Sequence, residues 1–527
     1  MSNRIFYSWV NPKLDLPLLL VLAICTGISS GISPQIGTYM VSGLSTNPAD
    51  AAMCNYAYFA GMTVAFSLID RIRSFFSPKQ LLVGICLGLI FCNTILSQTD
   101  SSALIVLLTF FVGVFRIMGA IIIVITLTPI LMPQGQRYML YCVYFPITLL
   151  VSPVGGWAMA TVANQVNWRF AFHFCNLLLF LGLIIVLIGV HNERPVKRLA
   201  LWKFDWFGHF LIAGWMLSFI YLLVYGRIND WFDSQHVVFA AIVFSTCIVF
   251  LLLRNTFQRH PLLHFEILKM RNIRIGFIIM FFFGAFFTMT NTMNTLMNIS
   301  FHTDPLENAR VNTYPVIGYV IGTLIAYFYF RRFNNFKIMI LTTILFYWMS
   351  CVMLYFLVDG QVSQYQLLLP MILRGIAIIL SYITIGLYVT TDVPGKYLPI
   401  IPFFLIFFRS FLGPTIWGNL YSNWLAIRQV QLLDKLAGWS ASDMSDPVFL
   451  ERFHLTNGHG VDIAKLYSIY RQQAVMSSLK ELLGYLCLGG IVFFVCVLFL
   501  PIYKKLDRNI LNWMKRKNQD EVTTVVS

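Results

Sequence analysis

Three arginines lie within long apolar stretches of this 527-residue chain: Arg116, Arg374 and Arg409. A charged side chain at the centre of a bilayer costs about 2.5–3.5 kcal/mol on insertion scales, and it nearly always faces the interior of the protein. Such arginines are suited to proton coupling, to gating, or to binding an anionic group of a substrate. The structural alternative is that they bond to backbone carbonyls or polar side chains and hold helices together.

A second polar feature is a row of three asparagines, Asn291, Asn294 and Asn298, with Thr288 just before them. Spacings of three and four residues place these side chains on one face of a helix. A polar stripe on a lipid-embedded helix should face the protein interior. We expect it either to bind substrate or to hydrogen-bond a neighbouring helix.

The composition identifies the elements that must position these residues. The chain is 58% hydrophobic and only 11% charged, whereas soluble proteins are about 25% charged. This scarcity of charge argues against a soluble enzyme, a disordered chain and a nucleic-acid binder. A spanning helix needs about 20 mainly apolar residues. Fourteen such runs predict an all-α polytopic membrane protein, at roughly 16–40, 51–69, 80–97, 103–131, 138–162, 170–190, 206–226, 236–253, 275–299, 313–330, 338–358, 365–390, 399–425 and 481–502.

The basic residues indicate the topology. With the N-terminus in the cytoplasm and the spans alternating, most of the 37 Lys and Arg residues fall on the cytoplasmic side. Most of those left outside lie in one long loop, 426–480, where the positive-inside rule has little force. The net charge of +15 therefore indicates orientation, and no nucleic-acid partner is expected. We predict an integral multi-pass protein of the plasma (inner) membrane with both termini in the cytoplasm.

The two halves of the chain repeat each other. Arg116 and Arg374 are separated by about 260 residues, and so are Arg71 and Arg331, and Pro153 and Pro414. Duplicated helix bundles around a midplane site are typical of secondary transporters that alternate access. We therefore predict a six-helix bundle over 1–190, two inserted transmembrane helices over 191–260, a second six-helix bundle over 261–502 with the outer loop 426–480, and a cytoplasmic tail over 503–527.

Several short motifs resemble those of the major facilitator superfamily, specifically its fourteen-helix drug/proton antiporter branch. Residues 167–172 resemble the family's N-W-R-W-x-F, residues 205–208 its D-W-x-G, and residues 152–156 its antiporter motif G-P-x-x-G-G. Arg116 matches the intramembrane arginine of the family's fourth span. The resemblance implies the major facilitator fold of two six-helix bundles plus two inserted helices.

Two of these matches imply roles in transport. Pro153, Gly155 and Gly156 should let the fifth span bend and approach a neighbour closely, because small residues permit close helix contact. The resemblance associates them with antiport and hence with export; a purely structural kink is the alternative. Asp70 and Arg71 match part of the family's loop motif after the second span, which implies a cytoplasmic gate. The alternative is ordinary loop charge.

The first span departs from the family because it contains no acid. Relatives usually have an intramembrane Asp there for proton coupling, whereas residues 22–31 contain none. No Asp or Glu lies in the middle of any predicted span. With arginines and no carboxylate at the midplane, burying a further cation would be unfavourable. We therefore hypothesise that the substrate is anionic or neutral and amphipathic.

These features together predict a secondary active transporter that exports amphipathic small molecules, drugs or anionic or neutral metabolites, by proton-coupled alternating access. The alternatives are a facilitator without proton coupling and a non-transporting sensor on the same fold. No metal-ligand cluster, nucleotide motif or convergent pair of acids is present in the sequence, so we predict neither an enzyme nor a cofactor. The expected partners are the small-molecule substrate and the lipid bilayer. Relatives in double-membrane bacteria can work with periplasmic adaptors, but no residue of this chain indicates one.

Overall fold

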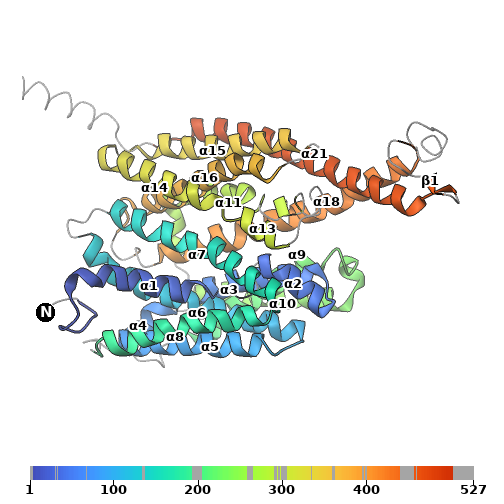
Figure 1. The fold of residues 1–527 in the computed structure, drawn as a ribbon. Coiled ribbons are helices and arrows are strands. Elements are labelled where there is room, and N and C mark those ends of the chain that lie inside the picture. Colours follow the sequence, from blue (N-terminus) through green and yellow to red (C-terminus); the bar gives the residue numbers. More distant parts are fainter. Residues whose placement is uncertain are drawn as a thin grey trace, which may run out of the picture.

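The computed structural model is almost entirely helical (Figure 1). It describes residues 4–29, 31, 34–66, 68–132, 137–192, 205–257, 265–289, 293, 294, 297, 305–333, 335–358, 363–394, 397, 400–438, 451, 456, 457 and 460–502. Lipid offers no partners for backbone N–H and C=O groups, so long apolar runs fold as helices, which satisfy these groups internally.

The first half of the chain forms one group of packed helices, coloured blue to teal in Figure 1. Its elements are η1 (Pro12–Leu14), α1 (Asp15–Gly27), α2 (Pro34–Leu44), α3 (Pro48–Phe66), α4 (Ile69–Phe75), α5 (Pro78–Leu96), α6 (Ser102–Leu131), α7 (Arg137–Gln165) and α8 (Phe170–Gly189). A hairpin of two helices follows, made of α9 (Trp206–Tyr225), η3 (Trp231–Asp233) and α10 (Gln235–Phe257). This inserted hairpin packs through α9 against α3.

The second half forms the other group, coloured yellow to red in Figure 1. Its elements are η4 (Phe265–Lys269), α11 (Arg271–Phe287), α13 (Pro305–Val311), α14 (Pro315–Arg332), α15 (Phe336–Leu357), η5 (Gln364–Leu367), α16 (Leu368–Thr390), α17 (Ile401–Ile406), the π-helical turn η7 (Phe407–Leu412), α18 (Gly413–Gly438), the strands β1 (Thr456–Asn457) and β2 (Gly460–Val461), and α21 (Ile463–Phe499). The two strands pair antiparallel.

Across the described residues, eleven helices are long and apolar enough to cross a membrane. The three other predicted runs also fall on helices, namely α1 with α2, the helix α3, and α11. The prediction of an all-α membrane fold is therefore confirmed. Helix α21 begins right after Asp462, whose side chain accepts a hydrogen bond from the Lys465 amide at 3.0 Å, and it runs without a break into the last predicted span. Helices α18 and α21 pack together and extend past the other helices toward β1 (Figure 1).

Two of the predicted spans are interrupted. In the first span, α1 ends at Gly27 and α2 begins at Pro34, with Gly31 between them at a φ of +64°. In the ninth span, about 260 residues further on, α11 ends at Phe287 and Thr288 forms a turn, after which residues 289, 293, 294 and 297 are helical again. Interrupted helices in corresponding positions of two halves are typical of binding sites in secondary transporters.

Close glycine contacts join the core helices of each group. In the first, α3 crosses α6, and a Cβ at Gly61 would collide with the Phe110 carbonyl while a Cβ at Gly113 would collide with the Tyr58 carbonyl. Each glycine thus contacts the residue three positions before the other glycine. Small residues let two backbones approach in this way.

The second group repeats this contact where α14 crosses α16. A Cβ at Gly318 would collide with the Ile372 carbonyl, and a Cβ at Gly375 would collide with the Pro315 carbonyl. The same three-residue relation holds in both directions, so Gly318 corresponds to Gly61 and Gly375 to Gly113.

Helix α7 connects the two groups. It packs on α1, α2 and α8 of the first and on α13, α14 and α16 of the second. Helix α3 makes a second connection through α17 and η7. Side chains on α3, α7, α16 and η7 can therefore meet where the halves join. The division of the chain at 190 and 260 stays a prediction.

Candidate functional site

Arg116 lies on α6 beside the aromatic ring of Tyr58 on α3. Its guanidinium donates a hydrogen bond to the Tyr58 hydroxyl, and its Cζ lies 5.6 Å from the ring centroid. The glycine contact between the two helices brings both side chains into reach. Arg116 is half-buried, so part of its charged side chain remains accessible.

Arg409 lies on the π-helical turn η7, next to two aromatic rings. Its Cζ lies 3.9 Å from the ring centroid of Tyr382 on α16 and 5.6 Å from that of Phe145 on α7. A cation over an aromatic face is attracted by the ring quadrupole. The Nε of Arg409 is buried without a hydrogen-bond partner among the described residues. A π-turn inside an α-helix is frequent at functional sites.

Helix α7 brings these two arginines into one site. Tyr144 of α7 lies within range of the charges of both Arg116 and Arg409, without a direct contact to either among the described residues. Next to it, Phe145 meets Tyr382 edge to face, with ring centroids 5.6 Å apart. Arg409 and Tyr382 of the second half contact Phe145 of α7. We call these three side chains, together with the nearby Tyr58, Arg116 and Tyr144, the interfacial cluster.

The interfacial cluster is positively charged and aromatic. The ion pairs found in the described part of the chain all use other arginines, Arg4, Arg169, Arg254 and Arg428. In the same part of the chain, no group of three or more His, Cys, Asp or Glu side chains could hold a metal ion. The chemistry on offer is charge-assisted hydrogen bonding to an anionic or neutral acceptor, together with stacking on aromatic faces.

Arg374 lies outside this cluster. Its side chain is only 3% exposed, and its Nη2 donates a hydrogen bond of 2.7 Å to the carbonyl of Phe287, the last residue of α11. A cation is favourable at the C-terminal end of a helix, where carbonyls have no partner in the helix. These contacts fit the structural interpretation, in which Arg374 caps the interrupted ninth span.

The asparagine stripe is described only in part. The side-chain oxygen of Asn294 accepts a hydrogen bond of 2.9 Å from Asn312, which follows α13. Asn291 and Asn298 lie outside the described residues. The contact of Asn294 joins two segments of the second half, as the helix-joining alternative requires.

The residues of the antiporter motif lie on α7 against the interrupted first span. A Cβ at Gly155 would lie 2.9 Å from Cγ1 of Ile28, and a Cβ at Gly156 would lie 3.0 Å from Cδ of Gln35. Pro153 is buried on the same helix. Close approach to a neighbour was expected here, and the neighbour is the break between α1 and α2.

Asp70 and Arg71 lie on α4, a short helix that follows α3. Their side chains are outside the described part of the structure, so the gate implied by the resemblance stays a prediction. The structure does show another contact between the halves. Arg137, the first residue of α7, donates a hydrogen bond of 2.7 Å to the carbonyl of Thr390, the last residue of α16. Its position at the edge of a span looks like ordinary loop charge in the sequence.

Asp205, the first residue of the D-W-x-G match at 205–208, links the two helices of the inserted hairpin. The Asp205 carboxylate accepts a hydrogen bond from the Gly208 amide at 2.9 Å. It also forms an ion pair with Arg254 of α10, at an N–O distance of 2.7 Å. Burial raises the pKa of Asp205, but the hydrogen bonds from Arg254 and Gly208 outweigh it and leave the pKa below its ordinary value. One carboxylate thus caps α9 and ties it to α10.

Comparison with known proteins gives distant relatives among exporters, and no family model matches the chain. The chain is 22% identical over 301 residues to the multidrug export protein EmrB of Escherichia coli K12, which covers 55% of this chain and 57% of that protein. For EmrB of Haemophilus influenzae the identity is 18% over 349 residues, covering 63% and 64%. The efflux pump dotC of Dothistroma septosporum is 29% identical over 146 residues, covering 27% and 24%. The alignments thus span less than two thirds of these relatives.

Solved transporter structures share the fold. The nucleoside transporter NupG aligns with a TM-score of 0.54 at 15% identity, over 92% of this chain and 100% of that one. The peptide transporter POT, in complex with sulfate, aligns with a TM-score of 0.55 at 14% identity, over 92% and 94%. The expected resemblance to a divergent major facilitator transporter is confirmed, and so is the fold of an integral membrane protein.

Proposed function

We propose that this chain is a secondary transporter that exports amphipathic small molecules, anionic or neutral, by proton-coupled alternating access. The observation that carries the proposal is the interfacial cluster. Arg116 comes from the first half of the chain and Arg409 from the second, and Arg409 contacts the ring of Phe145 on α7, beside Tyr144, which lies within range of both charges. The distant relatives are multidrug export proteins and efflux pumps by name, which supports export as the direction.

The chemistry of the cluster supports the substrate class. A guanidinium binds a carboxylate, sulfonate or carbonyl oxygen through charge-assisted hydrogen bonds. The rings of Tyr58, Phe145 and Tyr382 offer apolar faces beside it. A lipophilic cation would meet like charges there, with no counter-ion among the described residues, which is unfavourable away from water.

Alternating access supplies the mechanism. The cluster lies where the two halves meet, so rocking one bundle against the other separates its members and a bound substrate reconnects them. At the end where α7 begins, the hydrogen bond from Arg137 to the Thr390 carbonyl holds the halves together. We propose that this bond closes that end of the pathway, with Asp70 and Arg71 contributing to the same gate, and that this end faces the cytoplasm of a plasma (inner) membrane protein.

A facilitator without proton coupling is the second candidate. One observation favours it: the middle of every predicted span lacks Asp and Glu, and carboxylates commonly form the proton relays of transporters. Proton coupling of this chain would then need a group other than a midplane acid.

Flux into liposomes separates the candidates. The purified protein is reconstituted, and uptake of the anionic dye anilinonaphthalene sulfonate is compared with that of the cation ethidium, with and without an acidic interior. Proton-coupled export predicts protein-dependent uptake of the anion, faster with an acidic interior and at least about tenfold slower in Arg116→Gln. The exposed Arg332→Gln serves as the matched control.

Each alternative has its own outcome in this assay. Anion uptake that is indifferent to the pH gradient identifies a facilitator. No uptake of any dye by correctly folded protein favours the non-transporting sensor. Robust ethidium uptake that is lost in Arg116→Gln contradicts the proposed substrate class.

A further inference from the structure

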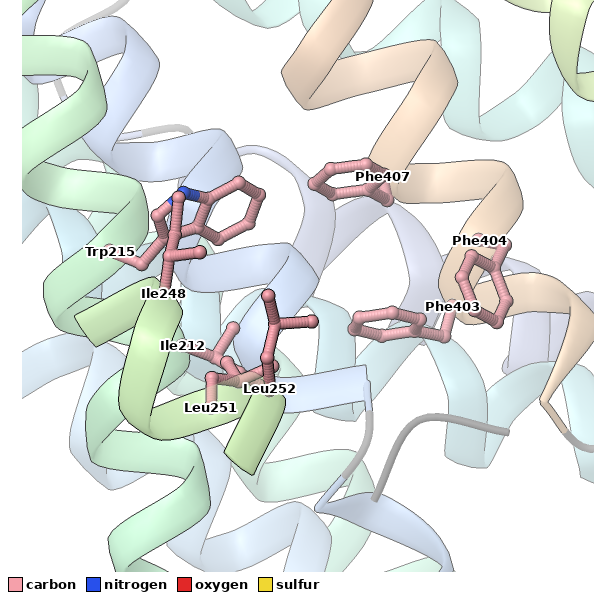
Figure 2. Close-up of a pocket in the computed structure, with 8 residues that line it drawn as sticks. All are labelled: Ile212, Trp215, Ile248, Leu251, Leu252, Phe403, Phe404 and Phe407. Carbon is pink, nitrogen blue, oxygen red and sulfur yellow. The ribbon is translucent and has the colours of Figure 1, made fainter. Parts of the chain in front are cut away.

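A hollow of about 200 Å³ lies between the inserted hairpin and the second half of the chain (Figure 2). Apolar side chains of α9 and α10 and phenylalanines of α17 and η7 line it. Because no polar surface faces this hollow, its lining would not select one ligand over another. Polar contacts that the proposed transport does not use lie elsewhere, beside the start of α1.

Residues 4–10 form an N-terminal strap that lies against the end of α8. Phe6 of the strap pairs with Val190 in an antiparallel bridge. Two backbone hydrogen bonds of 3.0 Å flank this bridge, one in each direction. Phe6 is buried, and a Cβ at Gly189 would lie 3.3 Å from its ring. The strap is therefore packed onto the first half of the molecule.

Arg4 ties the same strap to the start of α1. Its Nε and Nη2 donate hydrogen bonds of 2.6 Å and 2.8 Å to the two carboxylate oxygens of Asp15, the first residue of α1. Its Nη2 also donates to the carbonyl of Val10, whose side chain is buried. One arginine thus holds the two ends of the strap and the beginning of the first span together.

His191 fastens the strap to the end of α8 through its ring. The Nε2 of His191 is hydrogen-bonded to the backbone carbonyl of Arg4. A carbonyl can only accept, so Nε2 must carry a proton. The other ring nitrogen, Nδ1, is buried and has no hydrogen-bond partner among the described residues. The closed strap is therefore built around the neutral imidazole, with no proton on Nδ1.

A second proton on this ring would have no partner in the closed strap. It would bury both a positive charge and an unpaired N–H group, and each is unfavourable. Asp15 could compensate the charge, but Arg4 already binds both of its oxygens. Lys79 of α5 adds a further positive charge nearby, because it lies over the ring of Tyr7, which contacts the ring of His191. The charged groups described around the ring thus oppose its protonation.

We propose that the N-terminal strap is a pH-sensitive latch, closed while His191 is neutral and released when its imidazole is protonated. Histidine changes its charge between about pH 5 and pH 8 more readily than any other side chain. The latch is therefore closed at high pH, and it opens as the pH falls. Release frees the start of α1, the helix that ends at the break in the first span. The latch does not depend on the proposed transport.

Amide hydrogen exchange of the full-length protein in liposomes, at pH 8 and at pH 5.5, tests the latch. The amides to follow are those of Tyr7 and Val10, which are hydrogen-bonded in the closed strap. His191→Gln can still donate to the Arg4 carbonyl but does not titrate. We expect these amides to exchange at least about tenfold faster in the unaltered protein than in His191→Gln at pH 5.5, and equally fast at pH 8. Comparison at one pH cancels the intrinsic pH dependence of exchange.

Three further variants separate the imidazole from the other charges. His191→Arg places a permanent cation at the same position, so the strap should exchange fast already at pH 8. His236→Gln removes an exposed histidine of α10 and should behave like the unaltered protein. Asp15→Asn weakens the contact with Arg4, so it should speed exchange at both pH values and preserve the difference between them.

Two results overturn the latch when the unaltered protein is compared with the His191 variants. One is equal exchange of the unaltered protein and His191→Gln at pH 5.5. The other is a strap in His191→Arg that is as protected at pH 8 as in the unaltered protein. A pH response that Asp15→Asn abolishes and His191→Gln preserves would belong to the ion pair with Arg4, and it would overturn the latch as well. None of these measurements needs a transported substrate, so dye uptake tests the transport function separately.

Discussion

The two halves of the molecule contain the same glycine contact but different arginines. Gly61 and Gly113 join α3 to α6, and Gly318 and Gly375 join α14 to α16, with the same three-residue relation to the carbonyls they approach. This shared contact gives an internal register for comparing the halves. A residue in one half corresponds to a residue in the other half when both lie at the same number of positions from the equivalent glycine.

In this register, the two intramembrane arginines do not correspond. Arg116 lies three residues after Gly113, whereas Arg374 lies one residue before Gly375. Four residues make about one helical turn, or about 6 Å along the axis. Arg374 consequently reaches the Phe287 carbonyl at the end of α11, while Arg116 reaches the cluster at α7. Similar spacing in the chain thus leads to a structural role in one half and a proposed functional role in the other.

The largest expected effect is on the shared contact. Gly113→Val and Gly375→Val would each force a side chain into a backbone carbonyl, so we expect each to lower the free energy of unfolding by about 3 kcal/mol or more. The measurement is an unfolding titration in detergent. Gly84→Val is the control, because nothing lies within 4 Å of a Cβ there. A large loss in only one half would show that the two contacts are not equivalent.

The next largest effect distinguishes Arg374 from Arg116 by how much each substitution lowers the free energy of unfolding. Arg374 is itself almost fully buried, and Arg374→Met leaves the part-buried Phe287 carbonyl without this donor, so we expect a loss of about 1–3 kcal/mol in the same titration. Arg116→Met removes a half-buried contact to a tyrosine, and its loss should stay below about 1 kcal/mol. Equal destabilisation by the two variants would remove the distinction between them.

The inserted hairpin has no counterpart in this comparison. Asp205→Ala removes the cap of α9 and the ion pair to Arg254, so we expect a loss of about 1 kcal/mol at neutral pH. The folded pKa of Asp205 is lowered, so the carboxylate stabilises the protein above its ordinary pKa, near 3.8, and this contribution disappears as the pH falls through the folded value. Unfolding of both proteins from pH 7 down to pH 3 checks this, and a difference that grows on acidification would refute it.

The smallest expected effect concerns the connection between the halves. Arg137→Gln removes a charged donor to the Thr390 carbonyl, which we expect to shift the opening equilibrium at that end by about 1 kcal/mol, or about fivefold in population. Distances between spin labels at positions 138 and 391 measure this shift. Arg332→Gln, an exposed change on α14, should leave the distance distribution as it is.

The sequence predicted the helices well because each span must be long and apolar. Arg116 and Arg409 could be singled out because charge inside an apolar run is easily seen, and their roles in transport stay predictions. Bonding to a backbone carbonyl was one alternative for all three arginines, but it could not be assigned to Arg374 in particular, because no side-chain pattern marks such a partner. Tyr144 and Tyr382 were missed for another reason: with 47 Phe and 24 Tyr residues in the chain, an aromatic at the interface looks like one that faces lipid. Sequence spacing alone could not show which position of α6 is equivalent to which position of α16, because this equivalence is defined by the backbone contacts that each helix makes with its neighbour.

The most direct test of the account compares Arg116→Gln with Arg374→Gln in the liposome assay, with anion uptake expressed per folded molecule. We predict that Arg116→Gln lowers uptake at least about tenfold at an unchanged folded fraction, because it removes a group of the interfacial cluster. Arg374→Gln should lower the folded fraction and leave uptake per folded molecule within about twofold. Normal uptake by folded Arg116→Gln, or an equal loss of uptake in both variants, would contradict the assignment of different roles to the two arginines.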